Sequence, residues 1–276
     1  MAPCHATGLH LTLYCALTVK RLSVIIPSRS QPGQASFLAH ALKSISAQTA
    51  RASVTIEVVI GLDSGATLPD LPRTDLPVRC AQASERSQAA ALNAAAGLLT
   101  GDYVAFLEDD DQWQKGHLAV ALELLQQAQF VSTTQLEINP AGLILRINDF
   151  PTPSGWVMPR STLERVGGFD GAFRYHLDSD WLGRLGDAPL SRIHVAEATA
   201  PALVEAAREV RPWLAAVVSN GGGRVKLARH GGALPNVFRL VHPESGMYQL
   251  ATDPIKRQTH EDELARLQAK FGRVPW

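Results

Sequence analysis

The stretch LSVIIP, residues 22–27, is short, rich in β-branched residues and almost continuously apolar. Such a run is typical of a strand that is buried on both faces of a parallel sheet. The segment ASFLAHALKSISAQT follows at residues 35–49, with apolar residues at helical spacing, and VTIEVVIGLD at residues 54–63 reads as a second strand. The order strand, helix, strand predicts a doubly wound α/β fold.

The same alternation continues along the chain. A short strand is expected near Val78 to Ala81, then an alanine-rich helix over about residues 86–99, then the strand YVAFL at residues 103–107. The sequence therefore predicts a mostly parallel sheet with flanking helices. Ligands of such sheets bind at the carboxyl ends of the strands.

The composition is that of an ordinary globular chain. It has 276 residues, 26 Lys and Arg against 26 Asp and Glu, and 46% hydrophobic residues. Zero net charge and the lack of a Lys/Arg run argue against nucleic acid as a partner. Three scattered cysteines indicate neither a disulfide framework nor a zinc site, which fits a cytoplasmic protein.

The chain divides into three expected parts. The apolar segment GLHLTLYCALTV, residues 8–19, is shorter than the roughly 20 residues of a spanning helix, so we expect no transmembrane segment. Residues 1–21 are interpreted as an N-terminal tail or extra strand, residues 22–200 as the main domain, and residues 201–276 as a helical or mixed extension.

An unbroken acidic cluster follows the strand at residues 103–107. In VAFLEDDDQW, residues 104–113, four apolar residues lead directly into Glu108, Asp109, Asp110 and Asp111. Carboxylates at a strand end can hold a hard divalent cation such as Mg²⁺ or Mn²⁺. The alternative is a solvated turn that caps a helix beginning near Gln114, and the cluster alone leaves both interpretations open.

Four separated segments resemble the family 2 glycosyltransferases, which have the GT-A fold. They are LSVIIPSRS with ALKSISAQT, then IEVVIGLDSG, then GDYVAFLEDDDQW, then VMPRSTLERVGGFDGAF leading to DSDW, over about residues 22–185. The resemblance implies sugar transfer with inversion, a divalent metal (Mn²⁺ or Mg²⁺) and a nucleotide diphosphate sugar donor, foremost a UDP-sugar. It places the nucleotide-sugar half at about residues 22–112 and the acceptor half at 113–200. The acceptor stays open between a saccharide, a lipid-linked glycan and a small molecule.

The resemblance also implies which residues face the nucleotide. Asp63 stands where the family has an Asp that hydrogen-bonds the base, although Leu62 replaces the acidic residue that usually precedes it. An ordinary Asx-turn is the alternative for Asp63. The expected nucleotide-binding residues are Pro27, Ser28, Arg29, Asp63, Arg86 and Asp110.

The acidic cluster resembles the Asp-X-Asp metal element of the family. A shift of one residue still matches the pattern, so Asp110 and Asp111 are the preferred metal ligands, while Glu108 and Asp109 compete for these roles. Related enzymes often take a further ligand from a C-terminal histidine. Of the three candidates, His194, His230 and His242, we favour His242, and a surface or packed histidine is the alternative for each.

The expected catalytic base is Asp180 in DSDW. The family places a Glu-Asp pair before an aromatic residue at this point, and here Ser179 and Asp180 precede Trp181. Helix capping by Asp178 or Asp180 is the alternative. A carboxylate base suits the chemistry, because it can deprotonate the acceptor hydroxyl as the hydroxyl attacks.

Three rival functions remain open at this stage. A nucleotidyltransferase should have a glycine-rich, basic loop near the first strand, where PSRSQPGQAS has one Gly and one Arg. A retaining transferase would keep the metal but would not need the base. A non-catalytic sugar-nucleotide binding protein would bind UDP without turnover. Beyond residue 200 we expect a helix over 201–219, a glycine-rich turn, two short strands and a charged terminal helix, with a role in acceptor binding or as a lid.

Overall fold

A computed structural model describes residues 19–31, 34–142, 144–148, 150–196, 214–218, 225–229 and 237–275. Most of the expected N-terminal tail, His230 and the glycine-rich turn lie outside these residues. Within them, a strand at Leu214–Val218 stands where the expected helix over 201–219 was to end, so that end of the prediction is wrong. Its apolar sequence, LAAVV, ends in two β-branched valines and suits a strand that pairs on both sides.

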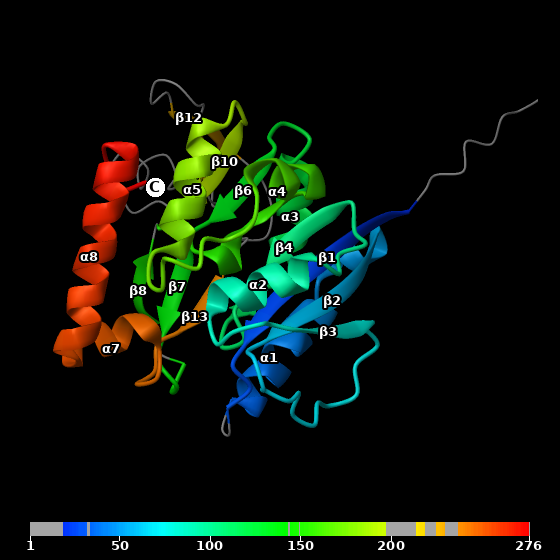
Figure 1. The fold of residues 1–276 in the computed structure, drawn as a ribbon. Helices are drawn as coiled ribbons and strands as arrows, with labels where there is room; N and C mark the ends of the chain where they lie inside the picture. The colour runs from blue at the N-terminus through cyan, green and yellow to red at the C-terminus, as the bar shows by residue number, and fades with distance from the viewer. Residues whose placement is uncertain are drawn as a thin grey trace, which may run out of the picture.

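A nine-stranded sheet forms the centre of the molecule (Figure 1). Its order is β12-β11-β10-β6-β9-β4-β1-β2-β3. Strands β3, β2, β1 and β4 pair in parallel, as does β6 with β10, whereas β9 and β11 run against their neighbours. The strands are β1 (Lys20–Ser28), β2 (Val54–Leu62), β3 (Val78–Gln82), β4 (Tyr103–Phe106), β6 (Phe130–Thr133), β9 (Val157–Pro159), β10 (Arg192–Ala196), β11 (Leu214–Val218) and β12 (Val225–Arg229).

Helices cover both faces of this sheet. On β1, Leu22, Val24 and Ile26 pack with α1 and α3, whereas Ile25 packs on the opposite face with α2 and α5. The predicted doubly wound, mostly parallel α/β fold is thereby confirmed. The helices here are α1 (Ala35–Ser46), α2 (Gln88–Ala96), α3 (His117–Leu124), α4 (Arg160–Val166) and α5 (Leu177–Asp187), with 3₁₀ turns at Thr49–Ala52 and Pro153–Gly155.

A second, four-stranded sheet joins the middle of the chain to its C-terminal part. Its order is β5-β13-β7-β8, so β13 from the C-terminal part lies between two earlier strands. Two helices follow, and α8 lies beside α5 (Figure 1). The elements are β5 (Gln112–Trp113), β7 (Gln135–Ile138), β8 (Ile144–Asn148), β13 (Val237–Leu240), α7 (Gly246–Thr252) and α8 (Pro254–Phe271). The expected charged terminal helix is α8.

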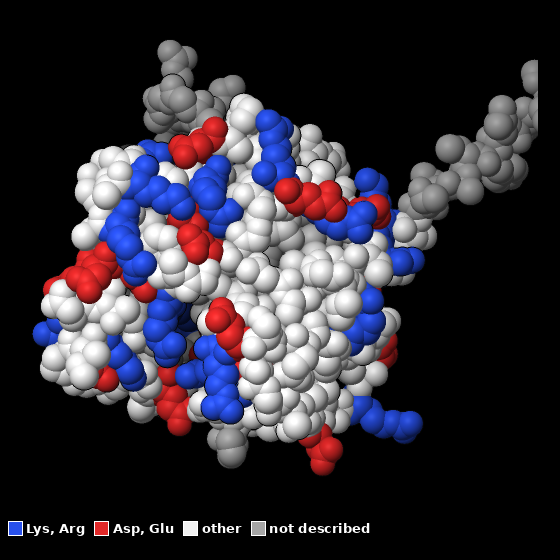
Figure 2. All heavy atoms as spheres, in the orientation of Figure 1, with Lys and Arg blue, Asp and Glu red and all other residues white. Residues whose placement is uncertain are grey.

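Charges of both signs are mixed over the surface. On the face shown in Figure 2, Lys and Arg side chains are interspersed with Asp and Glu, in keeping with the equal totals in the sequence. Among the residues that the structure describes, none of the helices combines the length and the apolar character that a membrane span requires.

The contact between α2 and the sheet generates a stability prediction. A Cβ atom on Gly61 of β2 would lie 2.0 Å from the backbone oxygen of Ala91 in α2. We expect Gly61→Ala to lower the free energy of unfolding by about 1–3 kcal/mol or more, because backbone cannot move aside as a flexible side chain can. The control is Gly97→Ala, where the nearest atom is 3.4 Å away and little change is expected. Equal urea-unfolding midpoints for the two variants would contradict the prediction.

Candidate active site

A cleft of about 570 Å³ lies where β1, β2 and β4 end. The ends of parallel strands meet at one edge of the sheet, so loops that are distant in the sequence face each other there. The loop before α5 and the C-terminal segment that contains β13 and α7 complete the walls. Six residues expected at the nucleotide line this cleft: Pro27, Ser28, Arg29, Asp63, Arg86 and Asp110.

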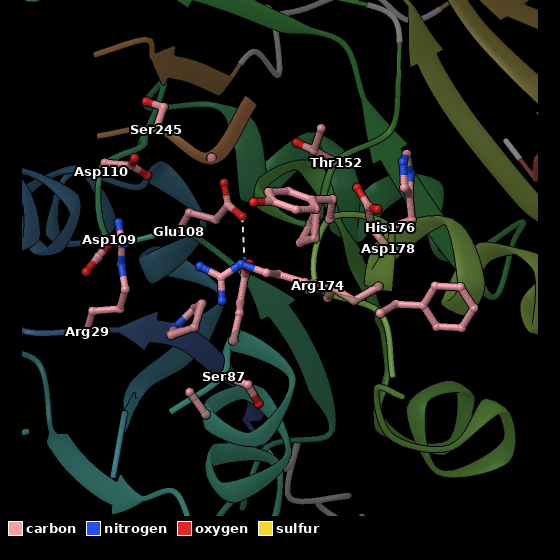
Figure 3. A pocket seen from close by; sticks show the side chains of 18 of the residues that line it. Arg29, Ser87, Glu108, Asp109, Asp110, Thr152, Arg174, His176, Asp178 and Ser245 are labelled. Carbon is pink, nitrogen blue, oxygen red and sulfur yellow. Dashed lines mark hydrogen bonds between the residues drawn. The ribbon is translucent and has the colours of Figure 1, made fainter. Parts of the chain in front are cut away.

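The acidic cluster forms a tight turn directly after β4. The amide of Leu107 donates to the Ile25 carbonyl of β1, which ties the start of the loop to the sheet. Glu108 and Asp110 line the cleft, and Figure 3 shows Glu108 near the centre of the view and Asp110 at the left. Asp109 accepts a hydrogen bond from Ser28 Oγ at 2.6 Å. The solvated-cap interpretation is not supported, because α3 begins at a backbone cap without a side-chain hydrogen bond.

Asp111 lies behind the cleft and joins three segments. Its side chain is about 1% exposed. Oδ2 accepts from Ser154 Oγ at 2.6 Å, and Oδ1 accepts from the Leu240 amide of β13 at 3.1 Å. Of the expected pair Asp110 and Asp111, only Asp110 therefore faces the cleft, which the competing candidates Glu108 and Asp109 also line.

The cluster fits a divalent cation. Glu108, Asp110 and Asp111 each offer an oxygen atom, and these atoms all lie within 4.8 Å of one another. His242 Nε2 lies 3.1 Å from Asp110 Oδ2, so an imidazole nitrogen could join the set. Carboxylate oxygens are the ligands that Mg²⁺ and Mn²⁺ prefer.

The electrostatics of the cluster also favour a cation. Burial and then the neighbouring Asp110 raise the pKa values of Glu108 and Asp111, and raise the pKa of Asp109 to about 7. Positive charge at this place would relieve both the loss of solvation and the repulsion. Arg239 of β13 supplies part of that charge. Although burial alone would lower the pKa of Arg239, the surrounding carboxylates raise it.

The part of the cleft at the end of β2 combines one carboxylate with arginines. Burial raises the pKa of Asp63, and the positive charges of Arg29, Arg86 and Arg174 oppose this shift. Arg86 is also tied to the loop after β2, because its Nε donates to the Ser64 carbonyl at 3.2 Å. This end can accept a hydrogen bond from a base and contact an anionic group.

Asp180 does not reach the cleft. Its side chain is fully buried and pairs with Arg184 Nε at 2.9 Å and with Lys270 Nζ at 2.6 Å. Successive residues of an α-helix turn by about 100°, so side chains two positions apart point to nearly opposite sides. Asp178, two positions earlier in α5, lines the cleft instead. We therefore replace Asp180 by Asp178 as the candidate base.

The environment of Asp178 suits proton transfer. Burial, with a contribution from the Glu108 charge, raises the pKa of Asp178 to about 7. Figure 3 shows Asp178 on the side of the cleft away from Asp110 and Arg29, with Glu108 between them. The N-cap position of α5 is His176, which makes no side-chain cap hydrogen bond, so neither Asp178 nor Asp180 caps the helix, although Asp178 Oδ1 accepts from the Ser179 amide at 2.7 Å. Helical spacing shows only that Asp178 and Asp180 point to opposite sides, and the packing of Asp180 against Lys270 of α8 decides that Asp178 faces the cleft.

Three other residues that line the cleft were not predicted from the sequence. Arg174 precedes α5, Arg239 comes from β13, and Ser245 precedes α7, so their partners are remote in the chain. The sequence carried no spacing signal for them. His194 is a packed histidine, since its side chain is buried and Nδ1 lies 2.9 Å from Ser132 Oγ.

Comparison with known proteins identifies one matching family. The family described as Glycosyl transferase family 2 matches residues 23–175, which is more than half of the chain. No curated protein matches at a significant level.

Solved structures share the fold at low sequence identity. S. aureus TarS 1-349 in complex with UDP aligns over 90% of this chain and 72% of its own, with a TM-score of 0.50 and 14% identity. Another TarS 1-349 structure aligns over 65% of this chain and 58% of its own, with a TM-score of 0.47 and 14% identity. Mannosyltransferase PcManGT from Pyrobaculum calidifontis, in complex with GDP-Man and Mn²⁺, aligns over 59% of this chain and 52% of its own, at a TM-score of 0.42 and 22% identity. The chain thus spans little more than half the length of the second TarS 1-349 structure and of PcManGT. The likeness to TarS 1-349 in complex with UDP bears out the GT-A fold.

The acidic cluster generates a prediction about two neighbouring carboxylates. Asp110→Asn is expected to weaken Mn²⁺ binding by about 10-fold or more without lowering the melting temperature, because an amide is a poorer ligand for a hard cation. Asp111→Asn is expected to lower the melting temperature as well, since the amide nitrogen cannot accept from Ser154 or Leu240. Calorimetric titration with Mn²⁺ and a melting curve measure the two effects.

The exposed Asp187 in the last turn of α5 provides a matched control. Asp187→Asn removes one carboxylate of the same kind and should change neither quantity. Equal Mn²⁺ affinities for Asp110→Asn and Asp187→Asn would contradict the assignment of Asp110.

Proposed function

Because the chain belongs to glycosyltransferase family 2, we propose that it transfers a sugar from a nucleotide diphosphate sugar to an acceptor hydroxyl. One observation carries the proposal. A single cleft holds the carboxylates of Glu108 and Asp110 on one side and a separate carboxylate, Asp178, on the other. Sugar transfer needs both, because charge develops on the leaving diphosphate while a proton leaves the acceptor.

The donor occupies the part of the cleft at the ends of β1 and β2. Asp63 accepts a hydrogen bond from the base, and Arg29 and Arg86 lie where they can contact ribose or phosphate. A UDP-sugar is the foremost donor. The fold likeness to TarS 1-349 in complex with UDP supports it.

A divalent cation, Mn²⁺ or Mg²⁺, completes the donor site. Glu108 and Asp110 would hold it from the cleft side, with Asp111 behind them and His242 beside Asp110. When bound, the cation neutralises charge on the diphosphate as a Lewis acid. A bound cation would explain why four carboxylates stand next to one another in the sequence, because they repel one another without a positive charge nearby.

Asp178 acts as the general base. Its carboxylate accepts the proton of the acceptor hydroxyl while that oxygen forms the new bond to the anomeric carbon and the diphosphate departs. A single displacement of this kind inverts the anomeric configuration. The cytoplasm fits this activity, in agreement with the three scattered cysteines.

The role of Asp178 separates an enzyme from a binding protein. We expect Asp178→Asn to lower kcat by roughly 10² to 10⁴-fold, the usual range for acid–base assistance, with little change in UDP affinity. Asp180→Asn should mainly lower the melting temperature, because the buried side chain would lose its charge pairing with Arg184 and Lys270. A thermal-shift screen of nucleotide sugars with Mn²⁺ identifies a working donor for the assay. Near-wild-type turnover of Asp178→Asn would remove it from the reaction.

The pKa of Asp178 also sets a pH dependence. The base must be ionised, and burial raises its pKa from 3.8 to about 7. Turnover should therefore fall as the pH falls, with the acid limb of kcat between about pH 5 and 7, since a cation near Glu108 offsets part of the shift. Initial rates across this range at saturating donor and Mn²⁺ test the prediction. A kcat that stays constant from pH 5 to 8 would contradict it.

A further inference from the structure

A buried carboxylate of α8 holds the loop that leads into α5. Glu263 is about 1% exposed. Its Oε1 accepts from the Arg174 amide at 2.7 Å, and its Oε2 accepts from the amides of Tyr175 and His176 at 2.8 and 3.0 Å. Three consecutive backbone N–H groups thus converge on one side chain from a helix about 90 residues later.

This arrangement constrains the loop to one conformation. Consecutive amides that point the same way form a concave site for an anion, and here the anion is part of the protein. A buried carboxylate without such donors costs several kcal/mol, so the loop and Glu263 depend on each other. The negative charge also lies next to the N-terminus of α5, where the helix dipole favours it.

The same loop carries two residues of the cleft. Arg174 lines the cleft, and its charge opposes the raised pKa of Asp63 at the nucleotide end. Asp178 lies in the first turn of α5, two residues after the last amide that Glu263 binds. Figure 3 shows Arg174 extending below Glu108, with Asp178 at the upper right. The hydrogen bonds of Glu263 therefore fix the backbone from which the side chains of Arg174 and Asp178 extend.

Further contacts of α8 hold the rest of α5. Lys270 pairs with Asp180, and Phe271 lies against Gly183, where a Cβ atom would be 2.5 Å from its ring. His260 Nδ1 lies 2.8 Å from His176 Nε2. These contacts fix the helix as a body, whereas Glu263 alone binds the backbone that enters the cleft wall.

We propose that Glu263 is a positioning residue, which acts through the backbone of residues 174–176 to place Arg174 and Asp178 for donor binding and proton transfer. The proposal rests on the proposed function, in which Asp178 is the base. It makes α8 a part of the active unit, although the family match ends at residue 175. A purely structural role would instead confine the effect of Glu263 to stability.

Glu57 provides a matched control for the experiment. It is also a buried carboxylate, about 8% exposed, and accepts from the Thr100 amide at 2.9 Å, from Ser23 Oγ at 2.5 Å and from Arg79 Nη2 at 2.9 Å. It lies in the first half of β2, away from the strand ends that form the cleft. Glu57→Gln and Glu263→Gln each remove one buried charge, and both are expected to lower the melting temperature.

Only the Glu263 variants should affect the cleft. We expect Glu263→Gln to lower kcat by roughly 10 to 100-fold, as small displacements of catalytic groups do, and Glu263→Ala to lower it further because no acceptor oxygen remains. UDP affinity in Mn²⁺ should fall by several-fold through Arg174. Hydrogen exchange at the amides of residues 174–179 should become faster than in Glu57→Gln, whose kcat and UDP affinity should stay within about twofold of wild type.

The readouts separate the two proposals. If the wild type turns over none of the nucleotide sugars, the proposed function fails, while hydrogen exchange and UDP affinity still test the anchor. Glu263→Gln with wild-type exchange at residues 174–179 would overturn the positioning role. The same holds if kcat and UDP affinity match those of Glu57→Gln at a similarly lowered melting temperature. Should Glu263→Ala fail to fold, Glu263→Gln alone decides, because one acceptor oxygen remains.

Discussion

The parallel pairing of β1 with β2 and β4 is the constraint on which the rest of the structure depends. Because all three strands end at one edge, Ser28, Asp63 and the acidic loop meet there although they are far apart in the chain. Hydrogen bonds then lock this edge, from Ser28 Oγ to Asp109 and from the Asp63 amide to the Ser28 carbonyl. The cleft is a consequence of strand topology, and its chemistry depends on which residues follow each strand.

Buried carboxylates explain how distant segments are recruited to this edge. A carboxylate removed from water needs donors or cations, and for Asp111 and Glu263 these come from segments remote in the chain. Asp111 obtains donors from Ser154 and from the Leu240 amide, so β13 is tied to the acidic loop. Glu263 binds the loop before α5 on the same principle. The C-terminal part of the chain thereby becomes a wall of the cleft.

The position of the candidate base shows how helical geometry decides between neighbouring residues. Asp178 and Asp180 have the same side chain and lie in the same turn of α5, but only Asp178 lines the cleft. Asp180 is paired with Arg184 and Lys270 on the other side of the helix. Loss of a partner would leave a buried charge unpaired, and the pairing leaves no free carboxylate for a substrate.

The sequence by itself determined the fold class and the donor side of the cleft. Continuous apolar strands and amphipathic helices are local patterns that predicted the fold and the edge of the sheet where ligands bind, and the resemblance to family 2 glycosyltransferases implied Ser28, Asp63, Arg86 and Asp110 as residues of that site. Tertiary structure alone decided the rest. Packing between segments about 90 to 130 residues apart decides whether Asp178 or Asp180 faces the cleft and which carboxylates of the acidic loop are buried. The contributions of Arg239 and Glu263 depend on the same packing. No local pattern encodes such a contact, because each partner is an ordinary polar residue until the fold removes it from water.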